Sequence, residues 1–223
     1  MKENLRERMQ ERWLRFWFRI GAIGDPMAAF EEIAQCYGES HRAYHTLEHI
    51  EQCLEELETI RWALTYPDAV ELAIWFHDIV YVTNPRFLAT ENERYSASKA
   101  DNFMYRLVRW NTIRRKKVFD YIVATRTHAL ALDDDCAYFL DIDMSILGQP
   151  DAEFDAYEAG IRFEHQHVPW DIFAEIRGKF VREWLQRAEE NKLFFTEFFG
   201  NKFNEQAKKN LEWSLVKPVD QTA

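Results

Sequence analysis

The 223-residue chain has few of the residues that break helices or cross-link a fold. It contains 7 glycines, 6 prolines and 3 cysteines, and the cysteines (Cys36, Cys53 and Cys136) are far apart, with no CxxC pair. Scarce glycine and proline argue against a fold made mostly of turns. Three widely spaced cysteines argue against a disulfide framework. No signal peptide is recognisable, so we expect reduced thiols and a cytoplasmic protein.

Long apolar runs and net positive charge are also missing. No apolar run reaches 18 residues, so we expect no membrane span. The formal net charge is −10, whereas a nucleic-acid-binding protein usually carries a positive charge. The one basic cluster, residues 106–117, is expected to be a solvated helix face, with contact to phosphate as the alternative. We therefore expect neither a membrane nor a nucleic acid as partner.

The abundant residues favour helices around a large core. The chain is 47% hydrophobic and 15% aromatic, and apolar residues recur at helical spacing. This pattern predicts an all-α, single-domain helical bundle over residues 1–223. Its core is expected at about 25–150, with an N-terminal helix and helices from 151–215 packed on it, as a monomer or homodimer. The expected helices are 3–20, 26–37, 47–64, 67–80, 90–110, 112–127, 134–147, 151–164, 170–187 and 205–215.

One apolar stretch contains an imidazole and a carboxylate side by side. Residues 73–81 read Ala-Ile-Trp-Phe-His-Asp-Ile-Val-Tyr, and in a helix both His77 and Asp78 would have apolar neighbours. A buried carboxylate is costly unless a cation, a hydrogen-bond network or a metal compensates it. Two interpretations meet that need: a His–Asp core pair that satisfies itself, and a metal site.

A second inward-facing carboxylate is expected in the helix 134–147. Asp143 has apolar residues one turn away on each side, and Asp141 lies about 200° around the helix. Asp143 is thus the expected ligand, with Asp141 as the alternative. Together with His49, His77 and Asp78 it forms a set of two imidazoles and two carboxylates. Such a set suits a divalent first-row metal and leaves coordination positions for water and substrate, as in metal-assisted hydrolysis.

These residues, in this order, resemble the HD-domain metal-dependent phosphohydrolases, and within them a bacterial branch of predicted HD phosphohydrolases that opens with Tyr-His-Asn-x-x-His. Thr46 stands where asparagine is usual. The resemblance covers roughly residues 10–215. Its blocks are 44–49 (YHTLEH), 75–81 (WFHDIVY), 92–97 (NERYSA), 141–148 (DIDMSILG) and 205–211 (EQAKKNL).

The resemblance implies an all-helical fold around one or two divalent metal ions (Mn, Mg, Co, Ni, Fe or Zn). The implied reaction is hydrolysis of a nucleotide or another small phosphorylated substrate by activated water, with Asp78 both ligand and catalytic residue. For moving protons we expect Glu93 or His128. Glu93 is equally placed to complete a capping box with Thr90, and His128 is alternatively a surface residue or a ligand of a second metal.

Three further residues are expected to contact substrate: Arg42, His45 and Asn92. A guanidinium matches the geometry of a phosphate bidentately, which favours Arg42. His45 lies four residues before His49 and is alternatively a metal ligand or a capping residue.

Two other functions fit the same residues. One is a non-catalytic sensor that binds metal and nucleotide without hydrolysis. The other is a hydratase or oxygenase variant of the fold, which is disfavoured because an oxygenase would be expected to need more His and Asp ligands than this set provides.

Overall fold

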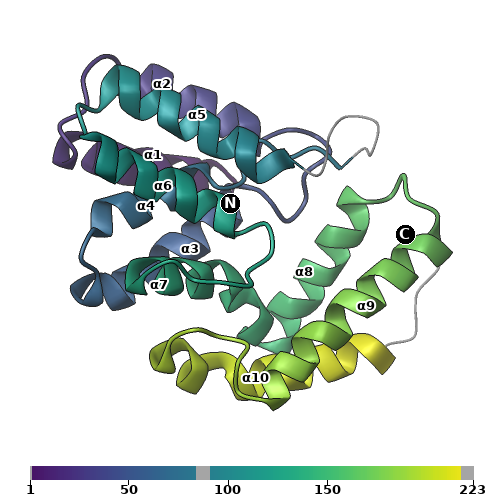
Figure 1. Ribbon diagram of the computed structural model, residues 1–223. Helices are drawn as coiled ribbons and strands as arrows, with labels where there is room; N and C mark the ends of the chain where they lie inside the picture. The colour runs from purple at the N-terminus through teal and green to yellow at the C-terminus, as the bar shows by residue number, and fades with distance from the viewer. Residues whose placement is uncertain (1, 84–90, 217–223) are drawn as a thin grey trace.

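The computed structural model describes residues 2–83 and 91–216, with side chains from Leu5 onward. Within these residues the chain forms ten α-helices and no strand, which confirms the all-α prediction (Figure 1). Two short 3-10 helices, η1 (Arg61–Ala63) and η4 (Ser145–Gly148), continue α3 and α7. The helices are α1 (Lys2–Arg19), α2 (Pro26–Tyr37), α3 (Leu47–Ile60), α4 (Pro67–Phe76), α5 (Asn92–Leu107), α6 (Thr112–Ala124), α7 (Asp134–Met144), α8 (Asp151–Glu164), α9 (Trp170–Glu189) and α10 (Glu197–Val216).

Side-chain caps fix where several helices begin. The Asp25 carboxylate accepts hydrogen bonds from the N–H groups of Met27 and Ala28, and Pro26 occupies the first turn of α2. Thr46 Oγ1 accepts the N–H of Glu48 at the start of α3. The cap of Thr46 matters most here because it sets the position from which His49, two residues into α3, points into the protein.

The buried apolar side chains form one continuous core, so the chain is a single helical domain. The core extends from Met9 in α1 to Leu211 in α10. On the α1 side it is aromatic, with the Trp13 ring 5.2 Å from that of Trp75 in α4. Figure 1 shows α1 to α7 gathered together, with α8, α9 and α10 beside them. No helix in the described ranges is both long and apolar enough to cross a membrane.

Helix α4 ends at Phe76, so the prediction of a helix to residue 80 is wrong. The backbone after Phe76 bonds to side chains of other elements instead. Arg42 donates to the carbonyls of Asp78 and Ile79, and Ser96 Oγ accepts the N–H of Val80. These tertiary hydrogen bonds replace the helical ones, and the chain turns away immediately after His77.

Helix α10 begins at Glu197, whereas the sequence predicted a start at residue 205. Asp141 is the reason. Its carboxylate accepts the N–H groups of Phe195 and Thr196 and the hydroxyl of Thr196 at 2.6–2.8 Å, just before the helix. The residue that organises this helix start is more than fifty positions away in the chain, so no local pattern announces it.

Candidate metal centre

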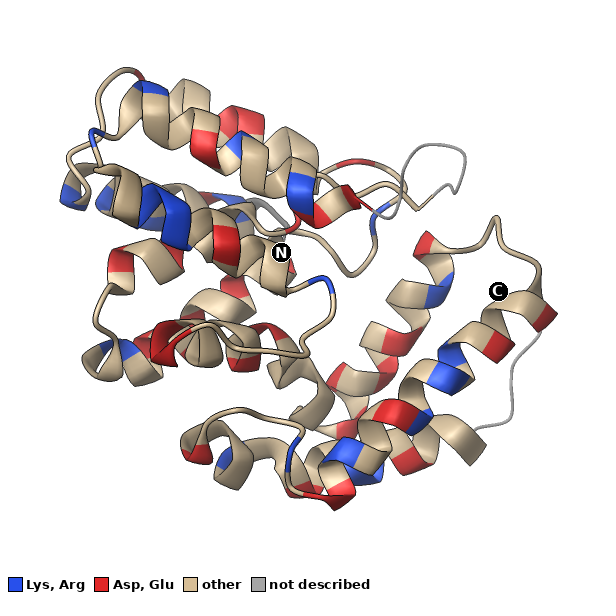
Figure 2. Ribbon diagram, viewed as in Figure 1, with Lys and Arg blue, Asp and Glu red and all other residues tan. Residues whose placement is uncertain are grey.

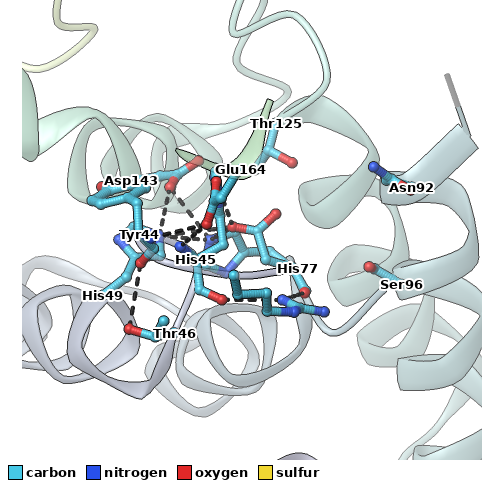
Figure 3. A network of polar contacts seen from close by, with 12 residues as sticks. Tyr44, His45, Thr46, His49, His77, Asn92, Ser96, Thr125, Asp143 and Glu164 are labelled. Atoms are coloured by element: carbon cyan, nitrogen blue, oxygen red, sulfur yellow. Dashed lines mark hydrogen bonds and ion pairs between the residues drawn. The ribbon is translucent and has the colours of Figure 1, made fainter. Parts of the chain in front are cut away.

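Three helices, α3, α4 and α7, bring two histidines and two aspartates together in the interior, and Figure 3 labels His49, His77 and Asp143 among them. His49 comes from the first turns of α3, His77 and Asp78 from the end of α4, and Asp143 from the last turn of α7. His49 and His77 are almost fully buried, at 3% and 1% exposure, and the side chains of Asp78 and Asp143 are 17% and 15% exposed. We call these four residues the His–Asp cluster.

The nitrogen and oxygen atoms of the His–Asp cluster converge on one point. The Nε2 atoms of His49 and His77 are 3.1 Å apart, and both lie 3.3 Å from Asp143 Oδ1. Asp78 Oδ2 lies 3.0 Å from His77 Nε2 and 3.8 Å from His49 Nε2. Five separations among four atoms thus fall between 3.0 and 3.8 Å.

These separations fit the ligands of a divalent metal ion. Nitrogen and oxygen ligands lie about 2.1 Å from such an ion, so neighbouring ligands are about 3.0 Å apart at octahedral angles and about 3.4 Å at tetrahedral angles. The donor types fit as well, because imidazole and carboxylate are the usual ligands of first-row metals when thiolates are not used. Two groups of residues, each with its ligand atoms within 4.8 Å of one another, could hold a metal ion: His49, His77 and Asp78, and His49, Cys53 and Asp143.

The orientation of His77 favours ligation through Nε2. His77 Nδ1 lies 2.9 Å from the carbonyl oxygen of Ile74, and a carbonyl only accepts, so Nδ1 carries the proton. In the neutral ring, Nε2 then presents its lone pair to the other members of the His–Asp cluster. A hydrogen bond of this kind from the far nitrogen is the usual support of a metal-bound histidine.

The electrostatics of the His–Asp cluster call for positive charge at its centre. Burial raises the pKa of Asp143, but the charge of His77 and the hydrogen bonds from His128 and His49 have a larger, opposite effect. The net result is a pKa well below its usual value. Burial lowers the pKa of His77, but the carboxylates of Asp78 and Asp143 outweigh it, and the net shift is well above the usual value. A proton on an imidazole meets this demand, and so does a metal ion.

Asp141 and Asp143 have separate tasks. Asp141 is fully buried, and both of its oxygens are occupied at the start of α10. Asp143, expected on the core face, is part-exposed and reaches His49 and His77. Asp143 thus points inward as expected, and Asp141, about 200° around the helix, is buried as well. The geometry places Asp143, rather than the alternative Asp141, at the His–Asp cluster.

His128 lies beside the His–Asp cluster, in the turn after α6. Its Nε2 is 2.9 Å from Asp143 Oδ2, and its ring packs edge-on against Trp184, with 5.7 Å between centroids. Its φ of 47° is in the left-handed region, which is uncommon for a residue other than glycine. The turn thus accepts some strain to bring this imidazole to Asp143.

His45 is held in place by Glu164, a residue that the sequence reasoning missed. Glu164 Oε2 lies 2.7 Å from His45 Nδ1, and Oε1 accepts the backbone N–H groups of Ala43, Tyr44 and His45 at 2.8–2.9 Å. The ring of His45 stacks on Tyr81, and its Nε2 is 3.8 Å from Asp78 Oδ2. Glu164 follows the apolar residues of α8 at helical spacing. A glutamate on this apolar face was the one sign in the sequence that its carboxylate has a buried partner.

Arg42 and Asn92, both expected to contact substrate, bind backbone instead. The Arg42 side chain is fully buried and donates to Glu39 and to the carbonyls of His45, Asp78 and Ile79. Asn92 accepts the N–H of Val82 and donates to its carbonyl, at 3.1 Å each. Figure 3 shows Asn92 on α5, well apart from the labelled histidines. In this geometry the hydrogen bonds of Arg42 and Asn92 tie the segment after His77 in place.

Glu93 and Cys53 lie around the site. Burial is the main cause of a raised pKa at Glu93, and the charge of Asp78 adds to it. Its predicted capping partner, Thr90, lies outside the described residues. Cys53 Sγ is 3.7 Å from His49 Nε2. The sequence placed Cys53 only in the apolar stripe of α3, and burial raises the pKa of its thiol well above normal, which keeps it neutral.

A cavity of about 450 Å³ opens next to the His–Asp cluster. Asp143, His128 and His45 are part of its lining, together with residues of α8 and α9. A small molecule in this cavity can therefore reach the carboxylate of Asp143 and both flanking histidines.

Comparisons of the chain with protein-family models, with curated proteins and with solved structures find no match. The chemistry of the protein must therefore be argued from the His–Asp cluster and from the cavity beside it.

Proposed function

We propose that this protein is a metal-dependent phosphohydrolase that acts on a small phosphate ester. The observation that carries the proposal is the convergence of two imidazole nitrogens and two carboxylate oxygens, 3.0–3.8 Å from their neighbours, at the end of a cavity. The order of these residues in the chain, which resembles HD-domain phosphohydrolases, supports the same function. A site closed on all sides would instead suit a structural ion.

In this proposal the ion is held by His49, His77, Asp78 and Asp143. A divalent cation bound there supplies a Lewis acid that polarises a phosphate ester and acidifies water. The chain supplies the rest. His128 fixes the second oxygen of Asp143 through Nε2, so that Oδ1 stays directed at the two histidines.

His45 and Glu93 take the roles that do not require a ligand position. Glu164 fixes His45 so that its Nε2 faces Asp78 at the cavity end, where it can donate a hydrogen bond to a phosphate oxygen. Glu93, whose raised pKa suits a group that gives up a proton, is assigned the proton transfer.

The charge distribution favours a small substrate over a nucleic acid. In Figure 2, lysines and arginines are interspersed with aspartates and glutamates on the helices. In α6, Arg115 is paired with Asp101, Lys116 with Asp120 and Lys117 with Asp133. With a net charge of −10, we propose no contact with nucleic acid.

The direct test is the metal content of the purified protein and of near-isosteric variants. We expect about one equivalent of a transition metal in the wild type after reconstitution with Mn²⁺, and loss of it in His77→Gln and Asp78→Asn. The matched control is His167→Gln, a change to an exposed histidine outside the site. A wild-type protein without metal, or variants that keep the metal, would mean that His77 and Asp78 are a core pair that satisfies itself.

The second test is turnover of a panel of phosphomonoesters and nucleotides by the Mn²⁺-loaded protein. Release of phosphate that is lost in Asp78→Asn supports hydrolysis. Tight, metal-dependent binding of a nucleotide with no product would instead favour the sensor interpretation.

A further inference from the structure

Helices α8 and α9 contribute an aromatic and apolar wall to the cavity beside the His–Asp cluster. Tyr157 and Ile161 come from α8, and Phe180 and Trp184 come from α9. The rings of Phe180 and Trp184 are 4.8 Å apart with 31° between their planes, so they form one continuous surface. Phe180 is only part-buried, which leaves aromatic surface open to the cavity.

This aromatic wall begins one side chain away from the proposed metal ligand. His128 contacts Asp143 through Nε2 at 2.9 Å and packs its ring on Trp184. A ligand whose phosphate lies at the Asp143 end of the cavity therefore places its next atoms past His128, along Trp184 and Phe180. His128 thus links the carboxylate of Asp143 to the aromatic rings of α9 in the cavity lining.

The charges in the lining are too few for a polyphosphate. Among the described residues that line the cavity, Arg126 is the one arginine, half-exposed and 3.7 Å from Glu91, and none is a lysine. Glu183, on the same wall as Trp184, adds a negative charge. Arg177 and Arg187 stack on the Phe180 and Trp184 rings but are not among the lining residues, and Arg177 is paired with Glu158. A second and third phosphate in the cavity would therefore lie among aromatic rings and a carboxylate, with Arg126 as the one guanidinium of the described lining.

We infer that the substrate is a phosphate monoester with a single phosphate and a compact organic half that carries an aromatic or apolar ring, which packs on Phe180 and Trp184. This inference rests on the proposed function. The inference extends the proposed function in two ways. It assigns the organic half of the substrate to α8 and α9, and it excludes di- and triphosphates as substrates. The cavity volume of about 450 Å³ is at the low end of small-molecule sites, which agrees with a compact ligand.

The test compares two phosphonates that share the head group and differ in the organic half. Calorimetry on the full-length Mn²⁺-loaded protein would measure the affinity for benzylphosphonate and for methylphosphonate. We expect benzylphosphonate to bind about tenfold more tightly or better, because burial of an aromatic ring is worth at least that factor. Phe180→Ala should remove this preference and leave the affinity for methylphosphonate unchanged. Trp213→Leu, a change to an exposed tryptophan of α10, should alter neither.

The outcomes separate this inference from the proposed function. Metal-dependent binding of both phosphonates with equal affinity would overturn the inference and leave the phosphate site standing. A metal-loaded protein that binds neither phosphonate would refute the proposed function itself. Trp184→Leu is a second variant for the wall, although its contact with His128 makes Phe180→Ala the cleaner change.

The single-phosphate part has its own readout. With one nucleoside as the organic half, kcat/KM for the monophosphate should exceed that for the triphosphate at least about tenfold. Glu183→Lys, which places a cation on the aromatic wall, should narrow that gap. A triphosphate hydrolysed as well as the monophosphate by the wild type would overturn this part.

Discussion

Glu164 is the residue whose replacement should reveal most about how the site is held together. Its carboxylate has no exposed surface and accepts three backbone N–H groups, those of Ala43, Tyr44 and His45, besides the His45 side chain. Burial raises the pKa of Glu164, but the hydrogen bond and charge of His45 and the backbone N–H groups have a larger, opposite effect. Together they lower the pKa to about 2. The carboxylate therefore stabilises the fold in its ionised form.

The size and sign of this effect follow from the two pKa values. In the unfolded chain a glutamate titrates near 4.5, so a folded value of about 2 corresponds to about 3 kcal/mol of stability at neutral pH. Because the folded-state pKa is the lower one, this stability is fully present above pH 4.5 and is lost as the pH falls toward about 2.

Two substitutions distinguish the charge from the hydrogen bonds. Glu164→Ala leaves the three N–H groups without their acceptor and should lower the free energy of unfolding by about 3 to 5 kcal/mol. Glu164→Gln keeps an oxygen for these N–H groups and should cost about 1 to 3 kcal/mol. The glutamine amide then donates to His45 Nδ1, so the ring keeps a proton only on Nε2, the nitrogen facing Asp78, and loses the positive charge that Glu164 favours.

Urea unfolding at pH 7 and at lower pH, with nitrogen NMR of the histidine rings, measures both effects. The control is Glu175→Gln, a change to an exposed glutamate of α9, which should stay within about 0.5 kcal/mol of wild type. A Glu164→Ala variant as stable as this control, or a His45 proton that stays on Nδ1 in Glu164→Gln, would refute the reasoning.

Three further predictions concern the two aspartates, a close helix contact and a hydroxyl. Asp143→Ala should remove bound metal and change the free energy of unfolding by less than about 1 kcal/mol. Asp141→Ala should keep the metal and lower the free energy of unfolding by about 2 to 4 kcal/mol, because the N–H groups at the start of α10 lose their acceptor. Metal analysis and urea unfolding measure both effects, and the reverse pattern would exchange the roles of the two aspartates. Gly148→Ala should destabilise by about 1 to 3 kcal/mol, since a Cβ there would overlap Phe203, and a melting temperature equal to wild type would contradict this packing. Tyr44→Phe should leave thermal stability unchanged or slightly higher, because the buried Tyr44 hydroxyl has no hydrogen-bond partner among the described residues, and a loss above about 1 kcal/mol would mean that it has one.

The sequence by itself determined that the chain is all-helical and that His49, His77, Asp78 and Asp143 belong together. Helical spacing and local caps are short-range features, so α2 and α3 begin where Asp25 and Thr46 indicate. The presence of His77 and Asp78 in an apolar run indicated a polar site inside the protein, because a buried imidazole and carboxylate need partners. His49 and Asp143 were named with them, and the geometry brings all four together.

Only the tertiary structure decided which polar groups are free to act. Arg42 and Asn92 look suited to a substrate in the sequence, but the backbone after α4 needs their hydrogen bonds because that segment is not helical. Asp141 and Asp143 differ by two positions, and the choice between them depended on a helix start more than fifty residues later. Glu164 is 119 residues from His45, and its role exists only because the fold places α8 beside the N-terminus of α3. Hydrogen bonds between distant segments follow from packing, and packing is a property of the whole chain.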